Sequence, residues 1–326
     1  MSFSTMIVRV VAFGLLLAAA GIVVAQQTYP SRPVRFIIPY PPGGSTDPMG
    51  RMIATKLTER WGQSVIVDNR PGGNTIIGTD LLAKATPDGY TIGWLGGAFF
   101  SISSLFPDLP FDTSKDFVGV TTIGKTRIVL VLHPSVPANN LQEFIALAKA
   151  RPGQLNFASS GVGTNVHLSG VLFNQVTGTN IIHIPYKGSG PASIDLLAGR
   201  VELSFQVPIT VIAMINAGRL KAIAVTGDTR LPALAEVPTF SEAGLPNFGW
   251  TSVTGIIAPA GTPRPMIGRI ASEVAAILAM PGTREFMAKQ GAEPFVSTPE
   301  QTTAVIKEEI ASYARIIKEA GIKNQP

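Results

Sequence analysis

The sequence predicts an α/β fold of two domains with a cleft between them, each domain a mainly parallel sheet flanked by helices. Three observations carry this prediction. Strand-like and helical stretches alternate along the chain, which is typical of sheets with helices on both faces. The length of 326 residues suits two domains of ordinary size. Two stretches, near residues 124–127 and 248–252, look like crossings between the domains.

These crossings divide the chain into a discontinuous first domain and an inserted second domain. We expect the first to comprise residues 26–126 and 252–326, and the second residues 127–251. The inserted segment has its own series of strands and helices, as a separate sheet requires.

The individual elements follow from hydrophobic periodicity and from turn residues. The predicted strands are 35–38, 64–67, 91–95, 128–132, 156–158, 181–184, 203–205, 221–225 and 254–258. The predicted helices are 48–60, 76–85, 141–150, 165–176, 191–198, 209–217, 263–279 and 299–320. The last helix is the best marked: Thr298 is its N-cap, Pro299 its first residue and Gln301 its capping-box partner, and Gly321 ends it.

The N-terminal segment, residues 1–25, has the pattern of a secretory signal peptide. One basic residue, Arg9, precedes an almost wholly apolar run over 10–24, and Ala25 ends a small-residue cleavage site. The alternative is a membrane anchor, but the apolar run is shorter than the ~20 residues that span a bilayer. The chain has no cysteine, which excludes a lipid-modified cysteine after cleavage. We expect export from the cytoplasm and cleavage near Ala25.

The charge pattern excludes a nucleic-acid-binding surface. The chain has 26 basic and 21 acidic residues, and they are scattered, with no run of five like charges. A mildly positive protein suits an anionic small molecule.

The most informative motif is a glycine loop between a strand and a helix. A buried strand over 34–38 breaks into Pro-Pro-Gly-Gly, and Asp47 and Pro48 follow as the N-cap and first residue of a helix. Such a loop exposes backbone N–H groups at the positive end of the helix dipole, which is a ready anion site. The residues expected to bind a ligand here are Tyr40, Pro42, Gly43, Gly44, Ser45, Thr46 and Asp47.

A second loop of the same design, Ser-Ser-Gly-Val-Gly-Thr over 159–164, follows the strand at 156–158. Ligands of open α/β sheets lie at the carboxyl ends of strands, so we expect both loops to face one cleft. The residues expected to bind from this side are Ser159, Gly161, Gly163 and Thr164. His167, in the first turn of the next helix, either reaches a carboxylate in the cleft or caps its own helix.

Four further loops at strand ends are candidates for the cleft lining: 70–74, 96–99, 185–189 and 206–208. Within them Lys187 either pairs with an anion or is a solvated loop charge.

Nucleotide, metal and catalytic motifs are excluded or missing. Residues 119–126 fit the P-loop pattern, but a strand ended by proline follows instead of the helix that a P-loop needs. The three histidines have no metal-ligand spacing, and we find no nucleophile with a base and an orienting group. We therefore expect no catalytic residue, no metal site and no cofactor.

The order of these motifs resembles the Bug-type periplasmic substrate-binding receptors of tripartite tricarboxylate transporters. The resemblance covers nearly the whole chain after the signal segment, and its combined pattern is specific although each piece alone is weak. The segments that carry it are 41–47, 68–72, 86–90, 158–161 with 167–168, 184–188, 236–239 with 242–244, and 258–263. The resemblance implies a periplasmic-binding-protein clamshell, with two lobes joined by two crossing strands and a carboxylate gripped by loops 40–47 and 159–164.

The sequence departs from the family pattern at three places, of which the family's position at Gln206 faces the cleft. Where many members have an aspartate after the strand at 203–205, this chain has Gln206, a neutral donor and acceptor. The usual glutamate after the His-Leu pair is Val171, and the usual Gly-Ala-Gly loop contains Asn74. These changes predict a ligand without an ammonium group, with Gln206 and His167 near its far end.

The function expected from these observations is that of a periplasmic, monomeric solute-binding protein for a small di- or tricarboxylate or aromatic acid. Its partners would be the permease subunits of a tripartite tricarboxylate-type transporter. One alternative is a ligand-sensing receptor for a sensor kinase. Another is an exported carboxylester hydrolase, with Ser159 or Ser160 and His167 as the remote nucleophile and base candidates.

Overall fold

The structure is a computed structural model that describes residues 29–246, 248 and 251–322. The expected signal segment and its cleavage site lie outside the described residues. Among the helices of the described ranges, none has the length and apolar character needed to cross a membrane.

The first sheet has six strands in the order β11-β4-β10-β3-β1-β2. The strands are β1 (Val34–Ile38), β2 (Val65–Asn69), β3 (Thr91–Leu95), β4 (Phe117–Thr126), β10 (Ser252–Pro259) and β11 (Ala292–Pro294). The helices in this part are α2 (Asp47–Trp61), η1 (Gly73–Thr75), α3 (Ile76–Ala83), α4 (Gly97–Leu105), α9 (Arg264–Ala279), α10 (Pro281–Lys289) and, after the last strand, α11 (Pro299–Glu319).

The second sheet has five strands in the order β7-β6-β8-β5-β9. The strands are β5 (Val129–Leu132), β6 (Asn156–Ser159), β7 (Ile182–Pro185), β8 (Leu203–Gln206) and β9 (Lys221–Val225). The helices in this part are α5 (Leu141–Ala150), α6 (Asn165–Thr177), α7 (Ser189–Leu197), η2 (Pro208–Thr210), α8 (Ile212–Asn216) and η3 (Pro232–Leu234).

Both sheets are mixed rather than mainly parallel. In the first sheet β1 pairs in parallel with β2 and β3, but β10 is antiparallel to β3 and β4, and β11 is antiparallel to β4. In the second sheet β6 is parallel to β7 and β8, but β5 is antiparallel to β8 and β9. The expectation of mainly parallel sheets came from the βαβ units alone. Strands β10 and β11 run against the other strands of the first sheet, and β5 runs against the other strands of the second.

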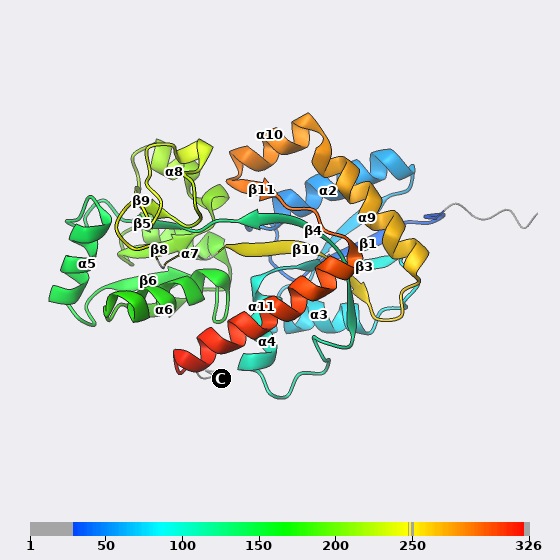
Figure 1. Cartoon of the computed structure of the whole chain (residues 1–326), viewed down its shortest axis with the longest axis horizontal. Coiled ribbons are helices and arrows are strands. Elements are labelled where there is room, and N and C mark those ends of the chain that lie inside the picture. The colour runs from blue at the N-terminus through cyan, green and yellow to red at the C-terminus, as the bar shows by residue number, and fades with distance from the viewer. Residues whose placement is uncertain (1–28, 247, 249–250, 323–326) are drawn as a thin grey trace, which may run out of the picture. The chain divides into compact units, whose positions relative to one another are not determined.

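The two sheets are connected through adjacent strands. In Figure 1, β4 leads directly into β5 of the second sheet, and β10 lies beside β4. β4 and β10 pair along their whole length, from Ser252 opposite Thr126 to Pro259 opposite Phe117. β4 contains the P-loop-like sequence, and the next element is strand β5, as the rejection of a nucleotide site required.

Most predicted elements are present, with ends shifted by a few residues, but β4, β11, α4 and α10 were not predicted. The capping box of α11 is present, since Thr298 Oγ1 accepts from Gln301 N and Gln301 Oε1 accepts from Thr298 N. The prediction for α2 was wrong in one detail. Asp47 is its first residue and Thr46 its N-cap, because the Asp47 carboxylate turns back to the glycine loop.

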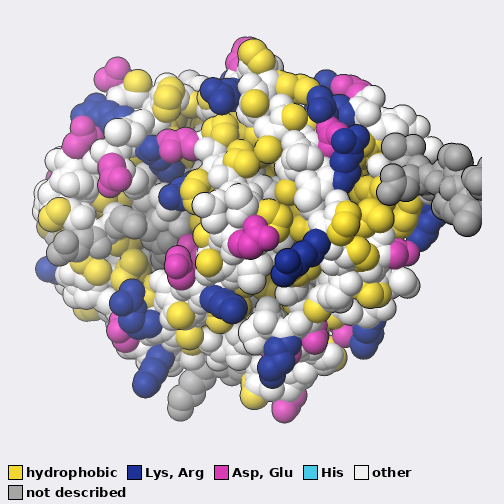
Figure 2. Space-filling model, turned by 45° about the vertical axis from the view of Figure 1, so that its right-hand side comes forward, with side chains coloured by type: hydrophobic (Ala, Val, Ile, Leu, Met, Phe, Trp, Pro, Cys, Tyr) yellow, Lys and Arg dark blue, Asp and Glu magenta, His cyan; other side chains and the backbone are white. Residues whose placement is uncertain are grey.

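Each sheet has its own apolar core. The first core contains Phe99, Phe100 and Tyr313, with Phe100 and Tyr313 ring centroids 5.5 Å apart. The second is a cluster of aromatic rings that includes Phe157, Phe173 and Phe205. On the face drawn in Figure 2, basic and acidic side chains are interspersed, in keeping with the scattered charge of the sequence.

Candidate functional site

Loops from both sheets line one cavity of about 160 Å³. The first part of the chain contributes Tyr40, Pro41, Pro42, Gly43, Gly44, Ser45, Thr46, Met49, Trp94, Gly96, Gly97, Ala98, Thr126, Thr254, Met287, Gln290 and Ala292. The second contributes Ser160, Thr164, Asn165, Val166, Lys187, Gly188, Ser189, Gly190, Pro191, Gln206, Val207 and Ile209. The cavity therefore lies where a ligand touches both sheets at once.

Four helices begin at the wall of this cavity, two from each part of the chain. The first residues of α2, α4, α6 and α7, or the residues just before them, belong to the lining. A helix N-terminus carries unpaired N–H groups and about half a positive charge. Four such ends facing one space favour an anion, and each contributes about 0.3–1 kcal/mol when partly exposed.

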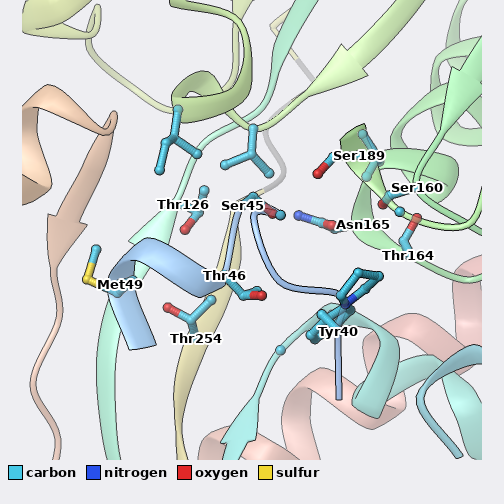
Figure 3. A pocket seen from close by; sticks show the side chains of 18 of the residues that line it. Tyr40, Ser45, Thr46, Met49, Thr126, Ser160, Thr164, Asn165, Ser189 and Thr254 are labelled. Atoms are coloured by element: carbon cyan, nitrogen blue, oxygen red, sulfur yellow. The ribbon is translucent and has the colours of Figure 1, made fainter. Parts of the chain in front are cut away.

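The polar side chains of the lining that Figure 3 labels gather mainly at one side of the cavity. Figure 3 shows Ser160, Thr164, Asn165 and Ser189 gathered on one side, whereas Met49 lies on the opposite side. Thr126 and Thr254 lie nearer to Met49. A ligand with one anionic end and a less polar remainder fits this distribution.

Charged side chains are almost missing from the lining. Among the described residues that line the cavity, Lys187 is the one with a charge, and none is acidic. A buried ammonium group needs an anionic partner, so this lining disfavours a ligand with an amine.

Asp47 holds the first glycine loop in place rather than lining the cavity. Its carboxylate accepts from Gly43 N (3.1 Å), Arg51 Nε (2.8 Å) and Asn69 Nδ2 (3.1 Å). Burial by itself raises the pKa of Asp47, but these hydrogen bonds outweigh it and hold the pKa below its usual value. Asn69 Nδ2 also donates to the Tyr40 carbonyl at 3.1 Å, which connects the end of β2 to the start of the loop.

The second glycine loop is held from behind by two histidines. His167 Nδ1 accepts from Gly163 N at 3.0 Å, and His183 Nε2 lies 2.6 Å from Ser159 Oγ. The two imidazole rings stack with centroids 3.9 Å apart. Burial lowers the pKa of His167 to about 3, with a further contribution from His183, and burial lowers that of His183 to about 4. Both rings are therefore neutral at ordinary pH and act as hydrogen-bonding supports.

The structure brings eight of the predicted ligand-binding residues to the cavity wall: Tyr40, Pro42, Gly43, Gly44, Ser45, Thr46, Thr164 and Gln206. The other five, Asp47, Ser159, Gly161, Gly163 and His167, lie behind the wall and shape the two loops. Of the two possibilities for His167, neither describes its contact fully, because it accepts from the loop and not from its own helix.

Two of the residues at the wall are already partly engaged within the protein. The Gln206 amide donates to Ser204 Oγ at 3.0 Å and accepts from Thr210 Oγ1 at 3.1 Å. Thr164 is the N-cap of α6: its Oγ1 accepts from His167 N and donates to the Gly161 carbonyl at 2.8 Å. Gln206 therefore keeps one N–H and one acceptor lone pair for a ligand, whereas the Thr164 hydroxyl can only accept.

Several lining residues were not predicted as site residues. Lys187, Gly188, Ser189 and Gly96–Ala98 lie in loops that the sequence marked as candidates, but Met49, Thr126, Asn165, Thr254, Met287 and Gln290 do not. Thr126 and Thr254 belong to the crossing strands, and this position is the signal that could have identified them. Met287 and Gln290 come from α10, which was not predicted at all.

The hydrolase candidates Ser159, Ser160 and His167 are not brought together as one group. Ser159 Oγ lies 2.6 Å from His183 Nε2, and Ser159 is fully buried outside the lining. Ser160 belongs to the lining, and His167 Nδ1 accepts from Gly163 N. No group of three or more His, Cys, Asp or Glu side chains that could hold a metal occurs in the described part of the chain.

The comparison with known families decides what this site belongs to. A model described as "Tripartite tricarboxylate transporter family receptor" matches residues 49–322. The chain belongs to this family. It is consequently a solute-binding receptor and not an enzyme, and the Bug-type resemblance is confirmed.

Individual relatives support the same assignment over nearly full length. Protein BugT of Bordetella pertussis is 39% identical over 315 residues, which are 95% of this chain and 96% of BugT. Two solved receptor structures also match. "R. palustris Rpa4515 with adipate" is 33% identical, with a TM-score of 0.87, over 91% of this chain and 100% of that one. The periplasmic binding protein BugD is 32% identical, with a TM-score of 0.84, over 91% and 100%.

A further solved structure, MatC of Rhodopseudomonas palustris with bound malate, is 28% identical, with a TM-score of 0.81, over 89% of this chain and 100% of MatC. The two-lobed fold that the sequence predicted is therefore confirmed for this receptor.

Proposed function

We propose that this receptor binds a small organic carboxylate without an amino group in the cavity between its two sheets. The observation that carries the proposal is the convergence of four helix N-termini on a cavity whose described lining has one lysine and no acid. The relatives with adipate and malate support a carboxylate of this size.

The absence of an amino group is the part of the proposal that a matched pair of ligands tests directly. Malate and aspartate have the same carbon skeleton and two carboxylates, but malate has a hydroxyl where aspartate has an ammonium group. Gln206 is a neutral residue at the wall, and it cannot balance that positive charge.

Thermal-shift and calorimetric titrations with malate, adipate, citrate, benzoate and aspartate test the proposal. An acid present at 100 times its Kd should add about 2.7 kcal/mol to the free energy of unfolding. We expect at least one of the amine-free acids to stabilise the receptor. The Kd for aspartate should be at least about ten-fold higher than the Kd for that acid. Tight binding of aspartate, or no binding by any of the acids, would overturn the proposal.

The two sheets with their helices are proposed as the lobes, residues 26–126 with 252–326 and residues 127–251. A ligand held by both lobes favours their closed arrangement over the open one. Arg127, between β4 and β5, lies at the proposed boundary, because its guanidinium donates both to Thr229, after β9, and to Glu293 in β11.

The proposed location is the periplasm, after removal of residues 1–25, and the proposed partners are the permease subunits of a tripartite tricarboxylate-type transporter. Mass spectrometry of the exported protein should find Gln26 as its first residue. Pull-down from membrane extracts with and without malate should recover permease subunits, and recovery of a sensor-kinase ectodomain instead would contradict the transport assignment.

A further inference from the structure

Trp94, near the end of β3, is a buried residue of the cavity lining, and its indole N–H is a hydrogen-bond donor separate from the helix N-termini. Trp94 is 4% exposed and belongs to the cavity lining. Its indole Nε1–H is buried and has no hydrogen-bond partner among the described residues. An indole N–H can only donate, and folded proteins pair nearly all such buried donors. The described residues therefore supply no acceptor for the Trp94 indole N–H.

The position of the indole is fixed by the first sheet. Trp94 lies opposite Ile256 in the β3–β10 pair, and its ring centroid is 6.2 Å from that of Phe36 in β1. A strand residue packed in this way has little freedom to turn and find another partner. The direction of Nε1–H is thus a property of the fold.

The indole N–H and the Tyr40 hydroxyl border the same point of the cavity wall. A Cβ atom placed on Gly96 would lie 3.1 Å from Trp94 Nε1 and 3.6 Å from the Tyr40 hydroxyl. Gly96 and Tyr40 are themselves lining residues. Gly96 has no side chain, and a larger residue at this position would crowd both groups.

Two lining residues, Tyr40 and Thr46, also carry hydroxyls. Burial raises the pKa of Tyr40 to about 12, while the Ala98 N–H lowers it by a smaller amount, so the phenol keeps its proton. Thr46 also lines the cavity, and its Oγ1 is buried without a hydrogen-bond partner among the described residues. In Figure 3, Thr46 lies between Thr254 and Tyr40.

We propose that Trp94 is a specificity-determining residue whose indole N–H, beside the Tyr40 hydroxyl, donates a hydrogen bond to an oxygen of the bound ligand. This inference rests on the proposed function. It adds that the ligand presents an acceptor oxygen at this point, and that a ligand with an N–H group there is rejected because the indole has nothing to accept with.

The test follows the indole N–H directly. The receptor has three tryptophans, so a ¹⁵N-indole-labelled sample gives few indole cross-peaks, and the W94F variant assigns that of Trp94. The probes are malate, adipate, citrate and benzoate, each titrated to saturation where calorimetry detects binding. We expect a downfield shift of the Trp94 Nε1–H signal on binding and a much smaller change for Trp61.

Calorimetry on two variants gives the second measurement. W94F keeps an aromatic ring but loses the donor, and we expect its Kd for the bound acid to rise about two- to twelve-fold, the effect of one neutral hydrogen bond, or more if the acceptor is ionised. W61F removes a tryptophan at the end of α2, outside the cavity lining, and should leave Kd unchanged.

Two results separate failure of this inference from failure of the proposed function. If an acid binds but the Trp94 signal does not move downfield, Trp94 does not donate to it and the inference is overturned while the function stands. If none of the four acids binds wild-type receptor, the proposed function is overturned, and the inference with it. The wild-type spectrum decides the first case even if W94F folds poorly.

Discussion

Asn74 offers the most direct test of how the two parts of the receptor are held together around the cavity. Its side-chain Nδ2 donates to the Val162 carbonyl at 2.8 Å. Asn74 lies in η1, after β2 of the first sheet, and Val162 lies in the glycine loop after β6 of the second. Leu168 of α6 also packs into the first core, so the hydrogen bond forms beside an apolar contact between the parts.

The substitution must remove the donor without disturbing the backbone. Asn74 has a φ of 53° and Thr75 a φ of 76°, both in the left-handed region. An alanine at position 74 would add about 1 kcal/mol of backbone strain. Aspartate tolerates this conformation and has the same shape as asparagine, but it cannot donate, so Asn74→Asp is the cleaner change.

The expected magnitude follows from one neutral hydrogen bond. A net contribution of about 0.5–1.5 kcal/mol is lost only when the two parts are in contact. Since a bridging ligand needs that contact, losing the bond should raise the Kd for the bound acid about two- to twelve-fold. Repulsion between the carboxylate oxygen introduced by Asn74→Asp and the Val162 carbonyl oxygen adds to this effect, so the range is a minimum. Calorimetry measures the Kd, and small-angle scattering with and without ligand measures the change in the proportion of closed receptor.

The matched control is Asn174→Asp. Asn174 Nδ2 donates to the Ile181 carbonyl at 2.9 Å, and both residues lie in the same part of the chain, around α6 and β7. This variant should lose stability but keep its Kd. The reasoning is refuted if Asn74→Asp is folded and binds as tightly as wild type, or if Asn174→Asp weakens binding equally.

Three further predictions follow from the two glycine loops. Burial lowers the pKa of His167 to about 3 and of His183 to about 4, so below pH 6.5 the unfolded chain binds more protons than the folded one. The free energy of unfolding should therefore fall between pH 6.5 and about 4, by up to about 1.4 kcal/mol per pH unit for each histidine, and equal urea midpoints at pH 7.5 and 5 would contradict this. Asp47→Asn removes the charged acceptor of the Gly43 N–H, and we expect a Kd at least about ten-fold higher with an unchanged circular-dichroism spectrum; unchanged affinity would show that the loop does not need this carboxylate. Gly163→Ala places a methyl group 2.2 Å from a side-chain carbon of α4 at a φ of +77°, so calorimetry should show binding weakened about five-fold or more, and wild-type affinity would mean that the loop can move aside.

The fold was predictable from the sequence wherever local signals were strong. Thr298, Pro299 and Gln301 mark the start of α11 through its capping box, and the structure shows that box. Helix α4 escaped prediction because it starts at two glycines, Gly96 and Gly97, which usually indicate a loop. Helix α4 is stabilised by packing in the first core, and the local sequence pattern does not reveal such tertiary contacts.

The site was predictable only where one loop builds one side of it. Gly43 and Gly44 were identified because glycine before a helix has a local meaning. Met287 and Thr254 reach the same cavity from α10 and β10, and only the packing of the whole chain brings them there. The sequence left open whether His167 reaches a carboxylate in the cleft or caps its own helix. Its position in the first turn of α6 does not distinguish these roles from the contact in the structure, in which it supports the loop behind the wall.

The pairing of β4 with β10 has a mechanical consequence. Both connections between the sheets run through one two-stranded ribbon, and Thr126 and Thr254 belong both to this ribbon and to the cavity wall. Thr254 Oγ1 also donates across the ribbon to the Gly124 carbonyl at 3.2 Å. A ligand that contacts Thr126 and Thr254 therefore touches the same two strands that join the sheets. We expect a change in the stiffness of this ribbon to alter the affinity even where the changed residue does not contact the ligand.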